Sequence, residues 1–196
     1  MTYKFRVPGR PKYWADAAGL KYRKFDLYPV TVPGSEVTPS PNPYGLSSSA
    51  WTTGVDGSNT TIDQNIADTN TTFVWRGYFK PDASSTSWQF RTRSNDGSWL
   101  WVDSEAEAGT TALITNNATV KNGGTHPEQT QTSANLNLTQ SSDDDSYYAI
   151  TLVAGNTAGA GSIRLEFRRD GGDWQSDGTG FYFYDSRRSD GFYYGS

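Results

Sequence analysis

The chain lacks cysteine altogether and has a single histidine among its 196 residues. The absence of cysteine excludes thiol catalysis, zinc–thiolate sites and disulfide bonds, so packing and hydrogen bonds alone must stabilise the fold. The histidine, His126, has no second histidine or cysteine with which to bind a metal, and no Ser-His-Asp spacing surrounds it. We expect it to lie in a surface turn.

Long apolar runs and clusters of positive charge are also missing. No apolar run reaches the roughly 18 residues of a transmembrane helix, and the basic N-terminus lacks the apolar stretch of a signal peptide, so we expect neither feature. The formal net charge is −4, and the 17 lysine and arginine residues are scattered along the chain. We expect no nucleic-acid partner, because no basic stripe is available to dock a phosphate backbone.

Turn-forming and aromatic residues, by contrast, are abundant. The chain has 20 Gly and 9 Pro, and 14% of its residues are aromatic. This composition is typical of many short strands joined by turns, so an all-β fold is expected. A 196-residue chain with 34% hydrophobic residues suits one domain with one core.

Apolar and alternating segments predict the strands, and no amphipathic helix or internal repeat is evident. The predicted strands are residues 19–28, 72–79, 88–93, 99–102, 112–115, 147–153, 163–168 and 181–184. The polar stretch 116–146 is predicted to be a long surface excursion.

The composition also divides the chain into an arm, a domain and a tail. Residues 1–18 form a basic, aromatic N-terminal arm, residues 19–185 the β-domain with a Pro-rich connector at 29–50, and residues 186–196 the C-terminal tail. Two interpretations of residues 1–50 are open. They pack against their own domain, or they wrap over neighbouring chains in an assembly.

The turn Asn95-Asp96-Gly97 is the first candidate for a binding site. Its two adjacent oxygen-bearing side chains suit a hard cation such as calcium, which takes about six to eight oxygen ligands. One pair cannot fill that shell. The candidates to complete it are sugar hydroxyls and the aspartates of the loop RRDGGDWQSDG, namely Asp170, Asp173 and Asp177. An ordinary hairpin turn is the alternative.

Three tryptophans are candidates for stacking on a sugar ring. Trp99 and Trp101 share one face of their predicted strand, with Leu100 and Val102 on the other face, and Trp174 lies in the aspartate-rich loop. A solvent-facing tryptophan beside an oxygen-rich loop can pack on the C–H face of a sugar. Packing in the core is the alternative for the two strand residues.

Other acidic residues offer weaker candidates. Consecutive carboxylates at Asp143, Asp144 and Asp145 point in different directions and are typical of a solvated loop. A glycoside hydrolase needs two carboxyl groups about 5 to 10 Å apart in a cleft, and Glu105 and Glu107 are available. Short surface loops on a small domain rarely form such a cleft, so we expect no enzymatic activity.

Four blocks of sequence, in this order, resemble the GLEYA family and the related protective-antigen-type lectin domains. They are residues 19–22 (GLKY), 77–81 (GYFKP), 94–102 (SNDGSWLWV), and 147–150 (YYAI) with 155–167. The resemblance covers about residues 19–170 and implies a sandwich of two antiparallel β-sheets. In adhesin members an Asp-Asp turn binds calcium that is shared with a glycan, which implies that Asn95 and Asp96 are the ligand pair here.

The chain departs from the family pattern at three of these positions. Asn95 replaces the first Asp of the pair, which removes one negative charge and should weaken calcium binding. Lys21 stands where the family has Glu, and Ala149 where it has Pro; both changes affect strand packing more than ligand binding.

Two functions follow as hypotheses. The first is a non-enzymatic, adhesin-like module that binds a glycan or cell-surface polysaccharide, displayed on a virion such as a phage particle, or on a cell surface or outside the cell by a signal-independent route. Its predicted ligand-binding residues are Asn95, Asp96, Trp99, Trp101, Asp173 and Trp174, and its predicted metal ligands are Asn95, Asp96, Asp170 and Asp173. The second is a structural decoration or assembly protein that keeps the lectin fold without a ligand and contacts virion proteins or copies of itself through residues 1–50.

Overall fold

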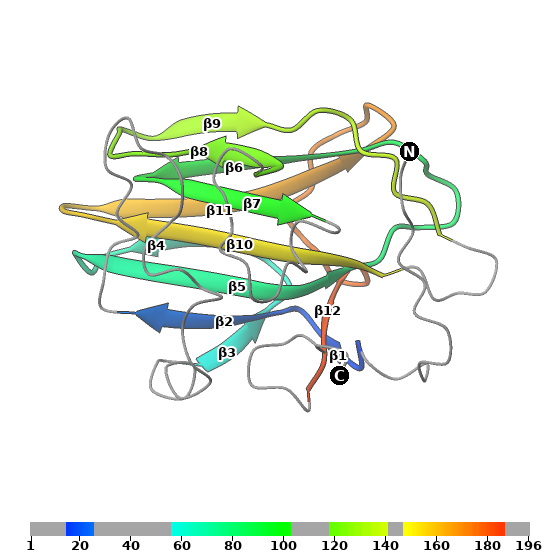
Figure 1. Ribbon diagram of the computed structural model, residues 1–196, viewed down its shortest axis with the longest axis horizontal. Helices are drawn as coiled ribbons and strands as arrows, with labels where there is room; N and C mark the ends of the chain where they lie inside the picture. Colours follow the sequence, from blue (N-terminus) through cyan, green and yellow to red (C-terminus); the bar gives the residue numbers. More distant parts are fainter. Residues whose placement is uncertain (1–14, 26–55, 103–117, 141–146, 187–196) are drawn as a thin grey trace.

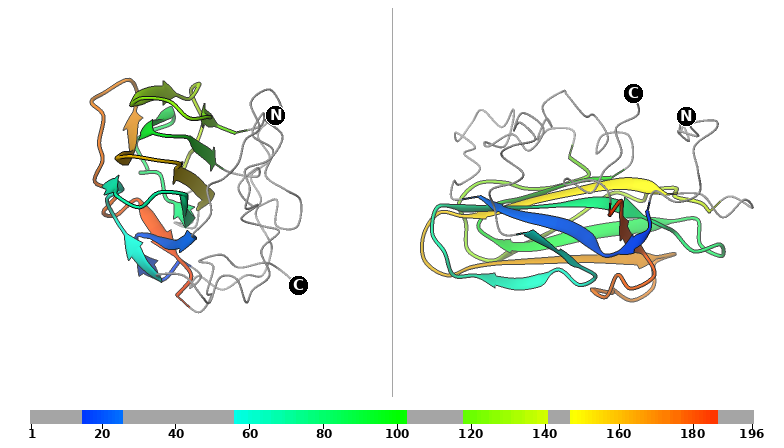
Figure 2. Two further views of the ribbon diagram at one scale, coloured as in Figure 1. Left: turned by 90° about the vertical axis from the view of Figure 1, so that its left-hand side faces the viewer. Right: turned by 90° about the horizontal axis from the view of Figure 1, so that it is seen from below.

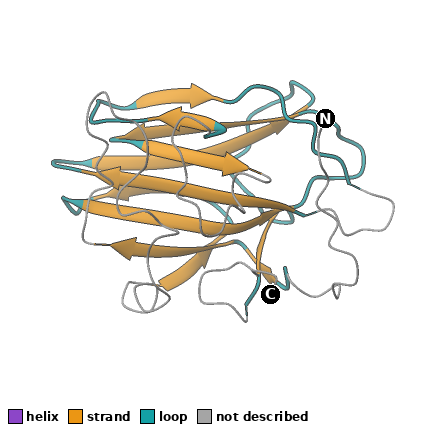
Figure 3. Cartoon of the chain, viewed as in Figure 1, coloured by secondary structure: helices purple, strands orange, loops and turns teal. Residues whose placement is uncertain are grey.

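The fold is a two-layer β-sandwich, as the resemblance implied. The computed structural model describes residues 15–25, 56–102, 118–140 and 147–186, which form two antiparallel sheets packed face to face (Figures 1 and 2). The described residues contain strands, turns and loops, with no helix (Figure 3). These residues therefore include no apolar helix long enough to span a membrane.

The larger sheet has eight strands. Its main order is β1-β12-β5-β10-β7-β8, with β2 paired to both β5 and β3. The strands are β1 Ala17–Ala18, β2 Leu20–Phe25, β3 Asp56–Asn59, β5 Thr71–Phe79, β7 Ser98–Val102, β8 Val120–Asn122, β10 Tyr148–Asn156 and β12 Tyr182–Tyr184.

The smaller sheet has four strands in the order β4-β11-β6-β9. They are β4 Asp63–Ile66, β6 Trp88–Asn95, β9 Gln129–Thr132 and β11 Gly161–Arg169. Alternation of apolar and polar residues turns one face of β11 inward, so Ile163, Leu165 and Phe167 are buried as predicted. The opposite, outward face of this sheet is polar.

Aromatic residues fill the core between the sheets. The Phe79 ring lies 4.9 Å from Trp88, 5.1 Å from Phe90 and 5.5 Å from Phe167, centroid to centroid and edge to face. Edge-to-face pairs add to the gain from burying the rings. This cluster joins the two sheets into one body.

A second apolar cluster lies on the other face of the larger sheet. It contains the buried side chains of Val74, Tyr78, Trp99, Trp101, Ala149 and Val153. The prediction that Trp99 and Trp101 face one way and Leu100 and Val102 the other is confirmed, because the latter two belong to the cluster between the sheets. Strands β5, β7 and β10 are therefore buried on both faces.

Each strand predicted within the described residues is present, but the segments that form β1, β8 and β9 were not predicted as strands. The excursion predicted at 116–146 contains β8 and β9, which extend the two sheets. Residues 17–18, predicted to end the arm, form β1 and pair with β12. Strands of two to four residues carry too little hydrophobic pattern to be recognised from sequence.

Several predictions concern residues outside those described. They are residues 1–14 of the arm, the connector 29–50, Glu105, Glu107, the strand at 112–115, Asp143–Asp145 and residues 187–196 of the tail.

Candidate functional site

Three connections between strands meet at one end of the sandwich, on the left in Figure 1. They are the β6–β7 turn with Asn95, Asp96 and Gly97, the β8–β9 loop that follows Asn122, and the β10–β11 hairpin that follows Asn156. Because neighbouring strands are antiparallel, β6 and β10 end on the same side where β7 and β11 begin. The predicted turn therefore lies among loops from distant parts of the sequence.

Asp96 holds the three connections together. One carboxylate oxygen, Oδ2, accepts hydrogen bonds from the Thr157 backbone N–H at 2.8 Å and from the Thr157 hydroxyl at 2.6 Å. The other, Oδ1, accepts one from the His126 backbone N–H at 3.3 Å. The residue is only 3% exposed. A nearly buried carboxylate with three donors is a strong anchor, since hydrogen bonds to charged groups are stronger than neutral ones.

Asn95 lies beside Asp96 at the end of β6, an inner strand of the smaller sheet. The peptide bond that joins them is cis. The Asn95 side-chain amide donates to the Ala160 carbonyl oxygen at 3.0 Å, which links the turn to the β10–β11 hairpin. Asn95 also stands directly opposite Ser162 in the pairing of β6 with β11. The turn and the hairpin are thus connected through both of its polar residues.

Asn156 is a further polar residue at this end, and it was not among the residues predicted from sequence. Its side-chain nitrogen donates to the carbonyl oxygens of Gly159 at 2.9 Å, Asp68 at 3.1 Å and Ile66 at 3.3 Å. Its side-chain oxygen is buried and has no hydrogen-bond partner among the described residues. A buried unsatisfied oxygen is uncommon and calls for an explanation. The available signal was an Asn that ends an apolar strand before a Gly-rich hairpin.

Gly161 shows how closely these groups approach one another. A Cβ atom at this position would lie 2.7 Å from Cγ of Asn156 and 2.8 Å from the Asn95 carbonyl oxygen. Only glycine leaves room for the Asn156 side chain and the Asn95 backbone to stand side by side. Asn95, Asp96 and Asn156 therefore form one oxygen-rich cluster, which we call the turn site.

Buried polar side chains support the turn site from inside the sandwich. The Asn122 amide donates to the Ser94 hydroxyl at 2.9 Å, the Ser94 and Ser98 hydroxyls lie 2.9 Å apart, and Ser98 donates to Thr92 at 2.9 Å. A satisfied polar network in a core fixes one arrangement of its strands. This network fixes the strands that enter and leave the turn.

His126 has a more specific place than the predicted surface turn. It is half-buried, its backbone binds Asp96, and its ring nitrogens lie 2.8 Å from the Pro127 carbonyl oxygen and 3.2 Å from that of Asn122. Both ring nitrogens face backbone acceptors within its own loop. The residue shapes the β8–β9 loop around the turn site.

The structure does not bring the predicted aspartates of the second loop to the turn site. Asp170 follows β11 and forms two hydrogen bonds with Ser87, just before β6. Its backbone N–H donates to the Ser87 carbonyl oxygen, and its carboxylate accepts from the Ser87 N–H. Asn95 lies at the opposite end of β6. At about 3.3 Å per residue, the strand separates the two positions by roughly 23 Å. Asp173 and Asp177 lie in the same distant loop. These aspartates therefore cannot share a cation with Asn95 and Asp96. The pairing of β6 with β11, from Asn95 opposite Ser162 to Trp88 opposite Arg169, keeps the two ends of the strands apart.

The structure gives the three tryptophans different surroundings. Trp99 and Trp101 are 0% exposed in the second apolar cluster. Their prediction as ligand-binding residues requires an exposed ring that can stack on a sugar, and neither ring is exposed. Trp174 is half-buried on the outward face of the smaller sheet. The guanidinium carbons of Arg91 and Arg168 lie 4.3 Å and 4.6 Å from its ring centroid, which makes two cation–π contacts.

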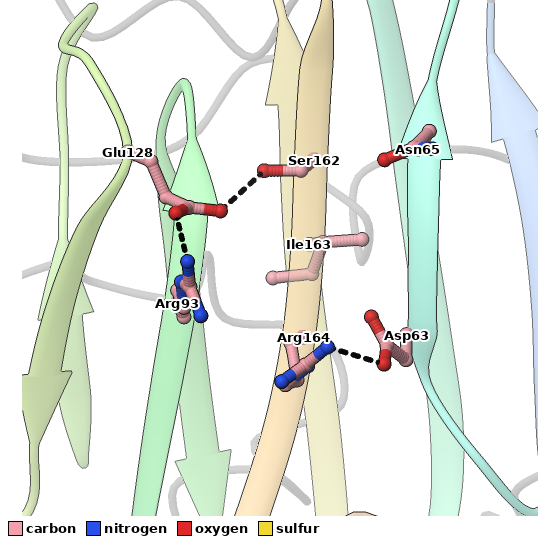
Figure 4. A pocket seen from close by; sticks show the side chains of 7 residues that line it. All are labelled: Asp63, Asn65, Arg93, Glu128, Ser162, Ile163 and Arg164. Atoms are coloured by element: carbon pink, nitrogen blue, oxygen red, sulfur yellow. Dashed lines mark hydrogen bonds and ion pairs between the residues drawn. The ribbon is translucent and has the colours of Figure 1, made fainter.

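A shallow groove of about 120 Å³ crosses the outward face of the smaller sheet close to the turn site (Figure 4). Two ion pairs flank it: Arg93 pairs with Glu128, and Arg164 pairs with Asp63 at 2.7 Å. Hydrogen bonding to Asp63 raises the pKa of the Arg164 guanidinium. The described residues contain no cluster of three or more His, Cys, Asp or Glu side chains that could hold a metal ion.

Comparison with known proteins identifies the fold. A sequence profile of the GLEYA domain matches residues 71–169, about half of the chain, and this range includes the whole turn site. No protein of curated function matches the chain by sequence.

Three solved structures illustrate the likeness. The A domain of epithelial adhesin 9 from Candida glabrata, in complex with Galβ1-3GlcNAc, superimposes with a TM-score of 0.59 at 16% identity, over 92% of this chain and 95% of that one. The PA14 sugar-binding domain from an RTX adhesin gives a TM-score of 0.55 at 16% identity, over 86% and 99% of the two chains. An anti-sigma factor domain-containing protein from Clostridium clariflavum gives 0.57 at 19% identity, over 93% of this chain and 51% of its own, so this chain spans about half its length.

Proposed function

The chain belongs to the GLEYA domain family, and from that premise we propose that it is a non-enzymatic, lectin-like module that binds a glycan at the turn site. The observation that carries the proposal is the convergence of Asn95, Asp96 and Asn156 at one end of the sandwich. Sugar recognition needs a few polar groups held in fixed positions. Adhesin A domains of this fold from Candida glabrata have been solved in complex with Galβ1-3GlcNAc and with β-lactose, which supports a glycan as the ligand.

Calcium is proposed as the cation of the turn site. Calcium prefers carboxylate, amide and carbonyl oxygens. The site offers the Asp96 carboxylate, the Asn95 side chain and the buried side-chain oxygen of Asn156, which no other described residue binds. When bound, calcium would supply coordination positions for sugar hydroxyl groups. With a single carboxylate in the set, we expect weaker affinity than for a site with an Asp pair.

The small size and the paired charges of the groove beside the turn site support the proposal of a non-enzymatic function. Its volume of about 120 Å³ is small beside the roughly 300 to 1,000 Å³ of pockets that enclose small molecules. Its two carboxylates, Glu128 and Asp63, each pair with an arginine. A shallow surface with paired carboxylates suits recognition better than hydrolysis.

A second candidate is a structural protein that keeps the lectin fold without a ligand. The observation in its favour is that both carboxylate oxygens of Asp96 already accept hydrogen bonds from the protein. Under this reading Asp96 serves only to join three loops, and residues 1–50 make the contacts with other proteins. Display on a virion or cell surface stays a prediction from sequence under either function.

Glycan binding separates the two candidates. We expect isothermal titration with Galβ1-3GlcNAc or β-lactose to give binding in calcium that disappears in chelator and in Asn95→Ala and Asp96→Ala. Asn95→Ala loses one hydrogen bond and should stay folded, which circular dichroism checks. Asp170→Ala is the matched control, because Asp170 also accepts a backbone hydrogen bond but lies at the far end of β11. Folded protein that binds neither sugar, nor any glycan on an array, would favour the structural candidate.

A further inference from the structure

We infer that the groove on the outward face of the smaller sheet is a second subsite, which takes a neutral sugar unit of a glycan bound at the turn site. The inference rests on the proposed glycan binding and extends it to ligands longer than one sugar. The groove is lined by Asp63, Asn65, Arg93, Glu128, Ser162, Ile163 and Arg164, which come from all four strands or their ends (Figure 4).

The charged residues of the groove form a row across the sheet. Arg93, Arg164 and Asp63 stand in opposite positions on β6, β11 and β4, and Glu128, just before β9, reaches Arg93 through its ion pair. Two like charges in directly opposite positions destabilise a sheet unless other groups compensate them. The two flanking carboxylates supply that compensation, and the row carries no net formal charge.

A row of this composition favours a neutral polyhydroxylated ligand over an ion. An anion would meet Glu128 and Asp63, and a cation would meet Arg93 and Arg164, so either would be repelled as well as attracted. A sugar hydroxyl, in contrast, donates one hydrogen bond and accepts others. It can donate to a carboxylate and accept from a neighbouring guanidinium at the same time.

The groups in the groove have bonding capacity left for a ligand. Among the described residues, Arg93 pairs only with Glu128 and Arg164 only with Asp63, through one guanidinium nitrogen each. A guanidinium carries several further N–H donors. The Ser162 hydroxyl lies 3.4 Å from Glu128, a long contact that a ligand can replace, and Asn65 adds an amide.

The groove is continuous with the turn site. Asn95 and Ser162 are opposite partners in the sheet, and Ser162 lines the groove. Arg93 precedes Asn95 by two residues on the same face of β6, a distance of about 7 Å along a strand. A glycan that contacts Asn95 with one sugar unit therefore reaches the groove with the next. At about 120 Å³ the groove accommodates part of one ring.

The test uses the double substitution Arg93→Met with Arg164→Met. Both arginine side chains are more than a third exposed, and such ion pairs contribute little to stability, so the variant should fold. Arg169→Met is the matched control, because Arg169 forms a similar ion pair with Asp82 at the other end of β11. The ligands are galactose, Galβ1-3GlcNAc, and a neutral tetrasaccharide that contains Galβ1-3GlcNAc, each in calcium.

We expect the double variant to bind the di- and tetrasaccharide about tenfold more weakly, as the loss of hydrogen bonds from charged groups predicts, and to bind galactose as the wild type does. Equal affinity of the double variant and wild type for all three ligands would overturn the inference. Amide chemical shifts in the wild type report the two sites separately. Shifts at Asp96 and Thr157 without shifts at Arg93, Ser162 and Arg164 keep the proposed function and reject the subsite. Shifts at the groove residues alone reject the turn site, and with it the inference that the groove is a second subsite of the same glycan. No shifts at all reject binding at both places.

Discussion

Thr157 donates two hydrogen bonds to one oxygen of Asp96, although the two residues are 61 positions apart in the sequence. The backbone N–H and the side-chain hydroxyl of Thr157 share this acceptor at 2.8 Å and 2.6 Å. The β10–β11 hairpin is thereby locked to the β6–β7 turn. The geometry of the turn site depends on this contact.

Substitution of Thr157 by Val should loosen the turn site. The variant keeps the backbone donor but loses the hydroxyl, and a hydrogen bond to a charged group contributes about 1.5 to 3 kcal/mol. We expect a fall of that size in the free energy of unfolding, measured by urea denaturation, together with weaker glycan binding. Thr157→Ser retains the hydroxyl and should behave like the wild type. Equal stability of the two variants would contradict this role of the hydroxyl.

Gly161 should not tolerate a side chain. Its Cβ would lie 2.8 Å from the Asn95 carbonyl oxygen and 2.7 Å from the Asn156 side chain, so Gly161→Ala must displace the turn, the hairpin or both. Gly159→Ala is the control in the same hairpin, where φ is +76° and no atom of the described residues lies within 4 Å of the new Cβ. We expect the control to lose about 1 to 2 kcal/mol from backbone strain alone and to retain ligand binding. Gly161→Ala should lose more stability and should lose binding.

The pH dependence of stability should reveal the contribution of Asp82, which pairs with Arg169 at the end of β11 away from the turn site. Burial disfavours the charged form of Asp82, but hydrogen bonds from Ser85, Arg169 and Ser84 outweigh burial and lower the pKa of Asp82 below its ordinary 3.8. A carboxyl whose pKa is depressed in the folded state stabilises the protein above its unfolded-state pKa, and this contribution is lost as pH falls through the folded-state value.

Asp82→Asn tests this contribution. The difference in unfolding free energy between wild type and variant should be constant near neutral pH and should shrink below the ordinary pKa of 3.8. Urea denaturation of both proteins over a series of acidic pH values measures it. A difference that does not change with pH would show that Asp82 makes no linked contribution.

Trp174 offers a direct test of the predicted sugar stacking. Its ring contacts the guanidinium groups of Arg91 and Arg168, and each cation–π contact contributes about 0.5 to 1 kcal/mol. We expect Trp174→Ala to lower the free energy of unfolding by about 1 to 2 kcal/mol and to leave the affinity for Galβ1-3GlcNAc unchanged. Loss of affinity in a folded Trp174→Ala protein would instead support the stacking predicted from sequence.

Asn95→Asp should convert the turn into a stronger calcium site. The added carboxylate raises the charge of the ligand set, so calcium should raise the melting temperature more in the variant than in the wild type. Without calcium the variant should be less stable, because its carboxylate replaces an amide that donates to the Ala160 carbonyl. Thermal melts in calcium and in chelator measure both effects. A variant that melts at the same temperature in both solutions would argue against calcium at this site.

The sequence by itself determined the fold class and most of the strands. Strand β11 was recognisable because Ile163, Leu165 and Phe167 alternate with charged residues, which reports one buried and one solvated face. The opposite orientations of Trp99 and Leu100 followed from the same period of two. Local patterns of this kind depend only on neighbours along the chain, so they can be read without coordinates.

Only the tertiary structure decided which polar residues meet. The turn was found from sequence, but its partners were sought in the loop of Asp170 and Asp173, roughly 23 Å away by the length of β6. The residues that do surround it are Thr157 and Asn156. Local sequence could mark Asn156 as the end of a strand but could not show that it meets the turn, because that meeting arises from antiparallel pairing that brings the ends of β6 and β10 together. Whether Trp99 faces solvent or an apolar cluster is likewise a property of the packed sheet, since alternation fixes the side of a strand but not what covers it.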